Sequence, residues 1–405
     1  MKILYHHRTA SKDGQAVHID ELIAAFRELG HEVHVVAPEA PAGAGMGGEV
    51  GWVGKLRALL PKAVYEVLEL GYSVLAYLKL ARAAREFRPD VIYERYNLFL
   101  LAGLLLKWRL RLPLLLEVNA PLAEERGRFG GLGLPWLARW AEGLVWRGAD
   151  VVLPVTRVLA SHVAVRGVPP QRIVVVPNGI NQVHFAAAPT PALAKAALGW
   201  NGALVLGFTG FVRDWHGVDR VLRWMAGADA PAQARLLVVG DGPARGDLER
   251  LARELHLGER VRFTGVIDRH EVPAHVAAFD IALQPAVVPY ASPLKLFEYL
   301  ALGKAIVAPR QPNIEEVLAD GANALLFDAA DPRGLESALT RLCADAALRE
   351  RIAAGASATI DRLGLTWQAN AQRIAGLVTT AARPGAPAAA ASAAAPSAAP
   401  GSRVS

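Results

Sequence analysis

Short apolar runs alternate with longer amphipathic stretches from the start of the chain. Ile3 to Tyr5 and Val33 to Val36 are largely apolar, and between them Ala16 to Leu29 repeats apolar residues at helical spacing. Short runs that are apolar on both faces are typical of strands in a parallel sheet covered by helices on each side. The pattern therefore predicts β-α-β units.

The same rhythm continues in two series along the chain. The first series predicts a helix over Leu134 to Arg147 and strands at Val91–Tyr93, Leu114–Val118, Val151–Val155 and Ile173–Val176. The second series predicts strands at Leu204–Phe208, Arg235–Val239, Val261–Thr264, Ile281–Gln284, Ala305–Ala308 and Ala324–Phe327. We expect an α/β fold of two doubly wound, Rossmann-like domains that face each other across a cleft, because such sheets bind ligands beyond the carboxyl ends of their strands.

Changes of composition place the domain boundaries. We assign residues 1–188 to the first domain and 189–365 to the second, with a stretch rich in proline and alanine between the two series. Residues 366–382 form a predicted helix that packs back on the first domain. Residues 383–405 are mostly alanine, proline, serine and glycine, so they bury too little to offset the entropy of ordering. They are predicted to be a disordered tail.

Composition narrows the class of protein. Hydrophobic residues make up 53% and charged residues 20% of the 405 positions, which excludes global disorder and supports two cores. The single cysteine, Cys343, excludes an internal disulfide and favours a reducing cytoplasm. The N-terminus lacks the apolar segment of a secretion signal. The net charge of +6 favours anionic partners, without choosing among phosphorylated ligands, nucleic acid and lipid headgroups.

The apolar stretch from Ala63 to Ala84 has nearly the length of a membrane span. It is interrupted by four charged residues, Glu66, Glu69, Lys79 and Arg82. Charges are rare within a spanning helix, so we do not expect this stretch to cross a membrane.

The segment YASPLKLFE, residues 290 to 298, carries the strongest chemical signal. Ser292 is a good N-cap, and Pro293 suits the first turn of the helix that would begin there. The free amides and positive dipole of this helix N-terminus suit a diphosphate, and Lys295 adds a full charge. Glu298 lies on the same face and can accept hydrogen bonds from ribose hydroxyls. The alternative is that Lys295 and Glu298 form an ordinary surface ion pair.

The surrounding sequence decides between these alternatives. Residues 292 to 309, SPLKLFEYLALGKAIVAP, resemble the donor-binding signature of glycosyltransferase family 4, whose members are retaining enzymes with the two-lobed GT-B architecture. Residues 238–267 resemble the nucleotide-binding segment of that family, and residues 207–222 resemble its donor-phosphate loop. The resemblance covers essentially residues 1–380.

The resemblance implies a nucleotide-sugar site in the second domain and an acceptor site in the first. The implied donor-binding residues are Gly14, Gly210, His216, Gly240, Asp241, Gly242, Val266, Ser292, Pro293, Leu294 and Glu298. Taken alone, the Gly-Asp-Gly turn at 240–242 is a weak signal, and the RVRFTG spacing after it makes it specific. Family members often carry an arginine where this chain has Phe211, and Arg213 is the candidate substitute, although it could be a surface charge.

On the acceptor side, the resemblance implies roles for His18, Glu94 and Glu124. Gly14 lets the first loop approach the cleft. His18, at the start of the first helix, could contact the acceptor or support packing.

Two positions depart from the family pattern. Many members have two glutamates eight positions apart, and the earlier one falls on Tyr290, whereas the later one survives as Glu298. A frequent histidine falls on Asn119, whose amide can hydrogen-bond a sugar hydroxyl but cannot accept a proton as imidazole does. In the mechanism usually inferred for such enzymes, the departing diphosphate takes the acceptor proton. Arg213, Lys295 and Asn119 are therefore the implied catalytic residues, which position reactants and stabilise charge.

No Asp-x-Asp triplet occurs in the chain, and such a triplet would be expected if a divalent ion bridged the donor phosphates. We predict a metal-independent enzyme that needs no cofactor beyond its nucleotide-sugar substrate. The expected acceptor is a saccharide or lipid-linked saccharide of exopolysaccharide or cell-envelope synthesis, and no nucleic-acid partner is expected.

Loose contact with the inner face of the membrane is a further expectation, because lipid-linked acceptors are common in the family. Two basic, aromatic clusters could provide it: Trp52, Lys55, Arg57, Leu59, Leu60 and Lys62, and Trp136, Arg139, Trp140, Trp146 and Arg147. The alternative is that the tryptophans pack in the core while the basic groups reach water.

Two other functions stay open at the level of sequence. A sugar-nucleotide epimerase shares the two-lobed architecture, and a catalytically silent nucleotide-sugar sensor would account for Tyr290 and Asn119. A nicotinamide dehydrogenase is disfavoured, because no G-x-G-x-x-G follows the first strand. The donor base, the sugar and the acceptor are not determined by the sequence.

Overall fold

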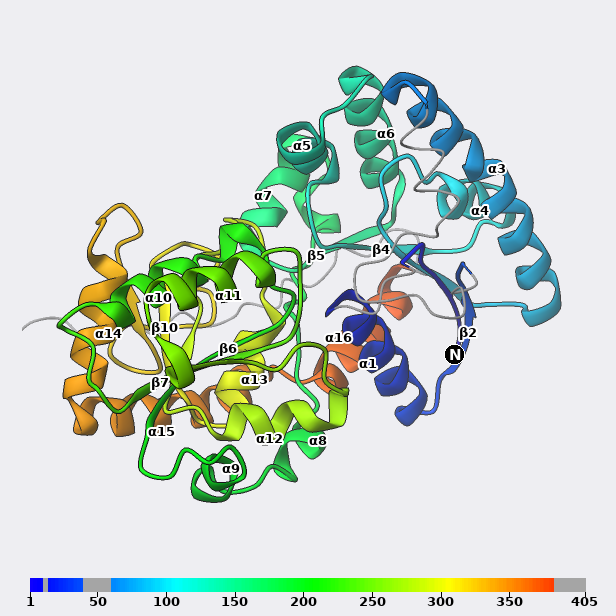
Figure 1. The fold of residues 1–405 in the computed structure, drawn as a ribbon. Coiled ribbons are helices and arrows are strands. Elements are labelled where there is room, and N and C mark those ends of the chain that lie inside the picture. The colour runs from blue at the N-terminus through cyan, green and yellow to red at the C-terminus, as the bar shows by residue number, and fades with distance from the viewer. Residues whose placement is uncertain (10–13, 39–59, 382–405) are drawn as a thin grey trace, which may run out of the picture.

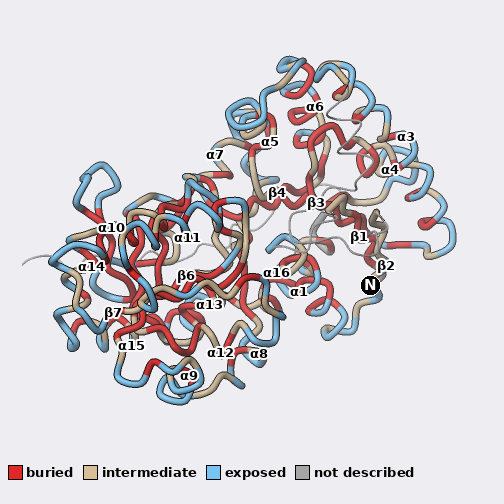
Figure 2. The backbone as a smooth tube through the Cα atoms, in the orientation of Figure 1, coloured by how far each residue is buried: buried red, intermediate tan, exposed pale blue. Residues whose placement is uncertain are grey.

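The structure is a computed structural model, and it describes residues 1–9, 14–38 and 60–381. It consists of two lobes, each built on a parallel sheet with helices on both faces (Figure 1). Apart from the edge strands β2 and β8, the strands of both sheets are buried along most of their length, whereas the helices alternate between buried and exposed faces (Figure 2). The predicted tail at 383–405 lies outside the described residues, as do Trp52, Lys55, Arg57 and Leu59.

The N-terminal lobe has a sheet of order β2-β1-β3-β4-β5 in which all neighbouring strands are parallel. Its strands are β1 (Lys2–His6), β2 (Glu32–Val36), β3 (Val91–Arg95), β4 (Leu114–Val118) and β5 (Val151–Pro154). Its helices are α1 (Gly14–Glu28), α3 (Lys62–Phe87), α4 (Ala102–Leu110), α5 (Leu122–Glu125), a π-helical turn (Arg126–Gly130), α6 (Pro135–Gly148) and α7 (Arg157–Val165). Ile3 and Tyr5 face α1, whereas Leu4 faces α3 and α4, as the two-residue period of a strand requires.

The C-terminal lobe has a parallel sheet of order β11-β10-β9-β6-β7-β8, the order of a Rossmann fold. Its strands are β6 (Leu204–Thr209), β7 (Ala234–Val239), β8 (Val261–Phe263), β9 (Ile281–Leu283), β10 (Ala305–Pro309) and β11 (Leu325–Phe327). Its helices include α8 (Gln182–Ala186), α9 (Pro191–Ala197), α10 (Val218–Ala226), α11 (Arg245–Glu254), α12 (Val272–Ala277), α13 (Leu294–Ala301), α14 (Gly334–Ala344) and α15 (Ala346–Leu363). The strand order reverses between β6 and β9, which is where ligands bind in such sheets.

One predicted strand differs in the structure. Ile173 to Val176 forms a single bridge, between Ile173 and Val152, rather than a sixth strand. The amides of Val174 and Val176 still donate to the carbonyls of Val152 and Pro154, at 3.0 Å each. The segment follows β5 only briefly, because from the next residues the chain turns toward the other lobe.

The chain crosses between the lobes twice, and the two crossings lie side by side. The amide of Ile180 donates to the carbonyl of Leu365 at 3.1 Å, and the amide of Trp367 donates back to Ile180 at 3.4 Å. A Cβ on Gly179 would lie 2.7 Å from the backbone of Thr366, so only glycine allows this approach. Ile180 and Phe185 pack in the C-terminal core, so the first crossing precedes residue 188.

The last helix, α16 (Trp367–Ala381), returns to the N-terminal lobe and packs against α1. Trp367, Ala371 and Ile374 belong to the same core as Tyr5 and Phe26. The second crossing therefore ties the end of the described chain to the first β-α unit, as Figure 1 shows for α16 beside α1.

Candidate active site

The helix predicted to hold a diphosphate starts one residue later than the sequence suggests. α13 begins at Leu294 with Pro293 as its N-cap, because Pro293 has an extended ψ of 121°. Ser292 is therefore not the N-cap, and no side chain caps this helix end. The carbonyl of Ser292 accepts instead a hydrogen bond from Asn178 Nδ2, at 2.6 Å. The first amides of α13 remain available to a ligand.

Lys295 lies on the first turn of α13 and carries a buried ammonium group. Its Nζ has no hydrogen-bond partner and lies 3.5 Å from the centroid of the Phe208 ring. Burial lowers the pKa of Lys295 to about 7, although the charge of Glu298 opposes this shift. A buried cation without an anion is costly, so this site is suited to an anionic ligand.

Glu298 does not pair with Lys295. Its Oε2 accepts a hydrogen bond from Thr209 Oγ1, at 3.1 Å, and Thr209 also contacts the hydroxyl of Tyr299. Burial raises the pKa of Glu298, and the Thr209 hydrogen bond and the Lys295 charge offset part of that rise. The surface ion pair considered for Lys295 and Glu298 is therefore not what the structure contains.

Two glycine loops meet beside Lys295, at the carboxyl ends of β6 and β7. Gly210 and Gly240 have φ angles of 119° and 123°, and a Cβ on Gly240 would lie 2.2 Å from the carbonyl oxygen of Gly210. A Cβ on Gly242 would lie 2.2 Å from the Val212 carbonyl oxygen. The glycines are thus required by close approach of the two loops to each other. Asp241 Oδ1 accepts a hydrogen bond from the amide of Gly242, at 2.8 Å.

His216 is buried close enough to Lys295 and Arg213 for their charges to affect its pKa. Its Nδ1 accepts a hydrogen bond from the amide of Arg213, at 3.1 Å. Burial, reinforced by the charges of Lys295 and Arg213, lowers the pKa of His216 to about 2. A neutral ring whose Nδ1 is an acceptor carries its proton on Nε2, so His216 can donate to a phosphate oxygen.

Arg213, from the predicted catalytic set, and Val266, from the predicted donor set, both have exposed side chains. Arg213 is exposed, and its guanidinium lies 4.9 Å from the centroid of the Phe211 ring. The ring of Phe211 therefore supports the guanidinium of Arg213, two positions later. Val266 follows β8 and is 59% exposed.

In the N-terminal lobe, a polar cluster gathers around the buried carboxylate of Glu117. Glu117 accepts hydrogen bonds from Tyr93 at 2.7 Å, from Asn119 Nδ2 at 2.6 Å and from Arg95, and His18 Nε2 lies 3.0 Å away. Burial raises the pKa of Glu117, but the charges of His18 and Arg95 outweigh it and hold the pKa well below its ordinary value. Asn119 is thereby fixed through its amide nitrogen, which leaves its oxygen to accept a hydrogen bond.

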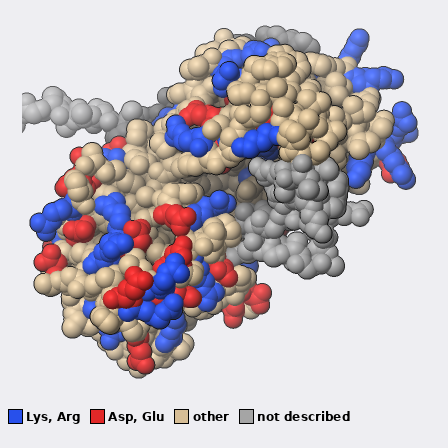
Figure 3. All heavy atoms as spheres, turned by 45° about the horizontal axis from the view of Figure 1, so that its top comes forward, with Lys and Arg blue, Asp and Glu red and all other residues tan. Residues whose placement is uncertain are grey.

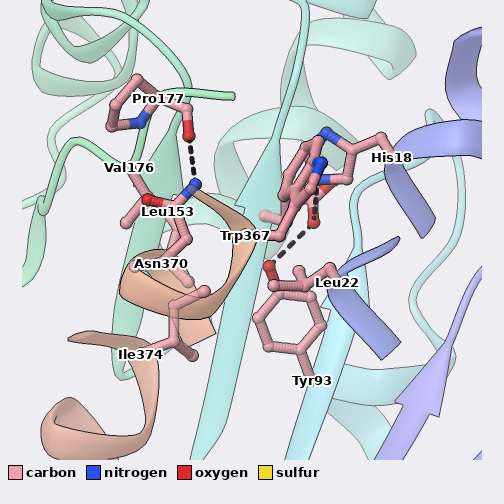
Figure 4. A pocket seen from close by; sticks show the side chains of 10 residues that line it. His18, Leu22, Tyr93, Leu153, Val176, Pro177, Trp367, Asn370 and Ile374 are labelled. Carbon is pink, nitrogen blue, oxygen red and sulfur yellow. Dashed lines mark hydrogen bonds and ion pairs between the residues drawn. The ribbon is translucent and has the colours of Figure 1, made fainter. Parts of the chain in front are cut away.

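His18 joins this cluster to the donor helix. Its Nδ1 donates to Asn178 Oδ1 at 2.8 Å, and Asn178 in turn donates to the carbonyl of Ser292. Figure 4 shows the His18 ring against Trp367, at a small cavity beneath α16 that Leu22, Tyr93 and Ile374 also line. Lys295 does not line that cavity. His18 is buried, so the structure favours the packing interpretation over direct acceptor contact.

The two predicted acceptor-side glutamates bind partners outside the cluster around Glu117 and Asn119. Glu94 is buried and accepts hydrogen bonds from His6 Nδ1 at 2.6 Å and from the amide of Gly103 at 3.0 Å, so it joins β1, β3 and α4. Glu124 is on α5, where it pairs with Arg128 at 3.1 Å and His162 at 3.3 Å. Gly14, by contrast, does reach the donor helix: its Cβ position lies 3.3 Å from Leu294.

Tyr290 connects the two lobes. Its hydroxyl donates to Glu125 Oε2 at 2.9 Å, its carbonyl accepts from Thr156 Oγ1 at 3.0 Å, and its ring is buried in the N-terminal core. The sequence indicated only that a glutamate is missing here. The sequence analysis did not identify Thr209 or Glu117 as site residues. The signal that could have found them is a polar residue at or next to the end of an otherwise apolar strand, since Thr209 ends β6 and Glu117 precedes the last residue of β4.

Sequence relatives of this chain are glycosyltransferases. Residues 13–179 match the glycosyl transferase 4-like domain, and residues 203–345 match the glycosyl transferases group 1 domain. The chain is 28% identical over 320 residues to the lipopolysaccharide core biosynthesis glycosyltransferase LpsD of Rhizobium meliloti, a match covering 75% of this chain and 79% of that protein. It is 29% identical over 331 residues to the 2-deoxystreptamine N-acetyl-D-glucosaminyltransferase of Streptomyces fradiae. That match covers 76% of this chain and 77% of the relative.

Solved structures share the architecture. HepE of Anabaena in complex with UDP matches with a TM-score of 0.71 at 18% identity, over 94% of this chain and all of that one. WaaG, a glycosyltransferase involved in lipopolysaccharide biosynthesis, matches with a TM-score of 0.68 at 17% identity. The match covers 94% of this chain and 100% of WaaG. Two facing Rossmann-like lobes of this kind define a GT-B enzyme. The chain belongs to the group 1 glycosyltransferases, and it is a transferase.

Proposed function

We propose that this glycosyltransferase is a retaining enzyme that takes a sugar from a UDP- or GDP-sugar. The acceptor is a saccharide or lipid-linked saccharide of exopolysaccharide or cell-envelope glycan synthesis. One observation carries the donor half of the proposal, the buried and unpartnered ammonium of Lys295 at the start of α13. Two similar proteins support a UDP- or GDP-sugar as donor. HepE was solved in complex with UDP-glucose, and a mannosyltransferase of Mycolicibacterium smegmatis is GDP-mannose-dependent.

At the carboxyl edge of the C-terminal sheet, hydrogen-bond donors can bind the diphosphate of a nucleotide sugar and a carboxylate can bind its ribose. The ammonium of Lys295, the Nε2–H of His216 and the first amides of α13 can donate to the diphosphate. The carboxylate of Glu298, already fixed by Thr209, can accept hydrogen bonds from two ribose hydroxyls. Arg213 is an exposed cation in the loop after β6. Its guanidinium can bind the phosphates from the solvent side.

The proposed reaction keeps the configuration of the sugar. The bond between the anomeric carbon and the diphosphate oxygen breaks, and the acceptor oxygen bonds to the same carbon on the same face. The acceptor proton passes to the departing phosphate oxygen, so no protein base is required. Lys295 and His216 stabilise the negative charge that grows on the diphosphate. The free oxygen of Asn119 can orient a sugar hydroxyl by accepting its hydrogen bond.

A catalytically silent nucleotide-sugar binder is the second candidate. Tyr290 is held by Glu125 rather than facing a donor sugar, and Asn119 is held by Glu117, so neither supplies the acidic or basic group that many relatives have there. Such a protein would bind the donor normally and would neither transfer nor hydrolyse the sugar.

Replacing Lys295 with methionine tests the proposal. Titration calorimetry with UDP-glucose, GDP-mannose and their nucleoside diphosphates should show binding to the native protein, and Lys295→Met should weaken it about 10- to 100-fold, as expected for a charged hydrogen bond. The variant should remain folded, because methionine suits a buried site better than an unpaired cation. Lys79→Met, on the exposed face of α3, is the matched control and should bind normally. Equal affinity in native protein and Lys295→Met would refute the donor site.

Metal independence stays a prediction. Among the described residues, no group of three or more histidine, cysteine, aspartate or glutamate side chains is placed to hold a metal ion. The prediction rests on the missing Asp-x-Asp triplet. Transfer from the preferred donor should continue in EDTA, and a strict requirement for manganese or magnesium would contradict the prediction.

A further inference from the structure

The first half of helix α3 turns two carboxylates inward and most of its large aliphatic side chains outward, whereas Leu80 in its second half is buried in the core. Glu66, Glu69 and Ser73 are buried at 4%, 6% and 3% exposure. Six large aliphatic side chains on the opposite side are 46% to 58% exposed: Val64, Val67, Leu68, Val74, Leu75 and Leu78. We call these six residues the α3 face. A surface helix of a globular protein normally has the reverse arrangement, with its apolar stripe toward the core.

Specific hydrogen bonds hold α3 in this orientation. Glu66 accepts from the amides of Gly133 and Leu134, at 2.7 Å each. Glu69 accepts from Arg126 at 2.7 and 2.8 Å and from Arg8 at 3.0 Å. Rotating the helix to bury the α3 face would break these bonds and leave buried acceptors unpaired. The outward apolar face is therefore a fixed property of the fold.

Exposed tryptophans lie on α4 and α6, the two helices next to α3. The Glu66 bonds place the start of α6 beside α3, and Trp136 and Trp140 on α6 are 63% and 47% exposed. The helix α4 packs along α3, and Trp108 near its end is 55% exposed. The sequence left open whether Trp146 joins such a surface or packs in the core, and the structure buries it fully in the core. Tryptophan at the edge of an apolar surface is typical of residues at a membrane interface.

The charges next to the α3 face are mainly positive. After Leu78, the exposed residues of the same helix and its C-cap are Lys79, Arg82, Arg85, Glu86 and Arg88, of which only Glu86 is acidic. Arg109 and Arg111 at the end of α4 and Arg139 on α6 are also exposed. In Figure 3, the N-terminal lobe presents blue groups around largely tan surface, whereas the C-terminal lobe mixes red and blue.

We propose that the α3 face docks the N-terminal lobe on a bilayer of anionic phospholipid. The six aliphatic side chains enter the boundary between headgroups and acyl chains, and the neighbouring basic residues bind the headgroup phosphates. From Val64 to Leu78 the face is about 21 Å long at 1.5 Å per residue, which suits a helix lying in the membrane plane. No helix of the described chain is long and apolar enough to span a membrane, so the contact is peripheral.

This docking goes beyond the transfer reaction and does not depend on it. Apolar faces of this extent on soluble proteins mark contacts with other proteins or with membranes. The basic residues at one end of the face match an anionic surface rather than an uncharged one. Lipid docking would bring the cleft near acceptors that are themselves held in a membrane.

Vesicle flotation tests the docking. The full-length protein is mixed with vesicles of phosphatidylcholine alone or with about one third phosphatidylglycerol, and the floating fraction is measured. The native protein should float with the anionic vesicles. Val74→Ser/Leu75→Ser/Leu78→Ser should reduce partitioning at least about tenfold, because three aliphatic side chains are lost from the bilayer. Arg82→Gln/Arg85→Gln should reduce it about fivefold per charge on anionic vesicles only.

A matched control shows whether lost flotation comes from the α3 face or from any loss of exposed aliphatic side chains. Val165→Ser/Val183→Ser removes two aliphatic side chains that are 85% and 83% exposed on α7 and α8, and it should float like the native protein. Nucleotide binding by each variant reports separately on folding and on the donor site, so a failure there would not be mistaken for lost docking. The single variant Leu78→Glu serves if the triple variant does not fold.

Two outcomes would overturn the docking. Equal flotation of the native protein and the α3-face variants would remove the face from any lipid contact. A native protein that stays with the soluble fraction and elutes as a dimer, while the triple variant elutes as a monomer, would assign the face to a second copy of this chain.

Discussion

Lys295 illustrates how one side chain is tuned by its surroundings. Its ammonium lies over the Phe208 ring, beneath the loop of Gly210, with no carboxylate bonded to it. Glu298, the acidic group that opposes the lowering of the Lys295 pKa, accepts a hydrogen bond from Thr209. The protein therefore keeps a cation ready for a ligand that brings the matching negative charge.

Donor affinity should depend on pH because of this residue. With the pKa of Lys295 lowered to about 7, the free protein loses the charge as pH rises above 7. A nucleotide sugar binds the protonated form, so its dissociation constant should be constant below pH 7 and rise toward tenfold per pH unit above it. Calorimetric titrations from pH 6 to 9 measure this, and Lys295→Met should show no such trend. A flat profile in the native protein would contradict the assignment.

The same pKa has a consequence for stability with the opposite sign. The unfolded chain holds the Lys295 proton up to its ordinary pKa of 10.5, whereas the folded chain releases it near 7. The unfolded state thus binds more protons between these values, and the contribution of Lys295 to the free energy of unfolding increases as pH rises through this range. Binding and stability should therefore respond to pH in opposite directions.

At the scale of elements, the donor site depends on two loops that touch. The loop after β6 and the loop after β7 approach so closely that Gly240 has no room for a side chain beside Gly210. The sequence predicted glycines here for ligand approach, and the structure assigns them first to loop packing. Lys295, on α13, lies against the first of these loops, so loop packing positions the ammonium as well.

Alanine at Gly240 should destabilise the protein. The φ of 123° and the 2.2 Å approach to the Gly210 carbonyl oxygen together should lower the free energy of unfolding by at least about 2 kcal/mol. Gly246→Ala is the matched control, because Gly246 lies in α11 with open space around its Cβ position. It should be neutral or stabilising by up to about 1 kcal/mol. Denaturant unfolding measures both, and equal stabilities would refute the loop contact.

At the scale of the whole molecule, the two lobes are held by polar contacts as well as by the paired crossings. Tyr290 and Glu125 form one such contact, and Arg269 of the C-terminal lobe pairs with Glu21 of α1. The carbonyl of Ser292, just before the donor helix, accepts a hydrogen bond from Asn178. The start of α13 is thus positioned by both lobes.

Removing the Tyr290 hydroxyl should loosen this arrangement. Tyr290→Phe and Glu125→Gln should each weaken donor binding about three- to tenfold, and the double variant should be little weaker than either, with a coupling near 1 kcal/mol. Calorimetry on the four proteins of the cycle measures the coupling. Tyr77→Phe, a partly buried residue of α3, is the control and should leave affinity unchanged. If the two substitutions weakened donor binding additively, the Tyr290–Glu125 hydrogen bond would not couple the donor site to the N-terminal lobe.

Much of this organisation was predictable from local sequence. Strand positions such as Leu114 to Val118 and Leu204 to Phe208 were confirmed, because nearly continuous apolar runs have few alternatives to a buried parallel strand. The two-lobed class was confirmed as well. The start of α13 was wrong by one residue, since whether Pro293 takes a helical or extended ψ depends on contacts that the sequence does not reveal.

The sequence by itself determined the alternation of elements, the family and the helix that carries Lys295 and Glu298, because each follows from residues close together in the chain. Only the tertiary structure decided what these side chains meet. It buried Lys295 without a partner, paired Tyr290 with Glu125 across 165 positions and turned the aliphatic side of α3 outward. Such contacts join residues distant in the chain, so periodicity and spacing contain no record of them.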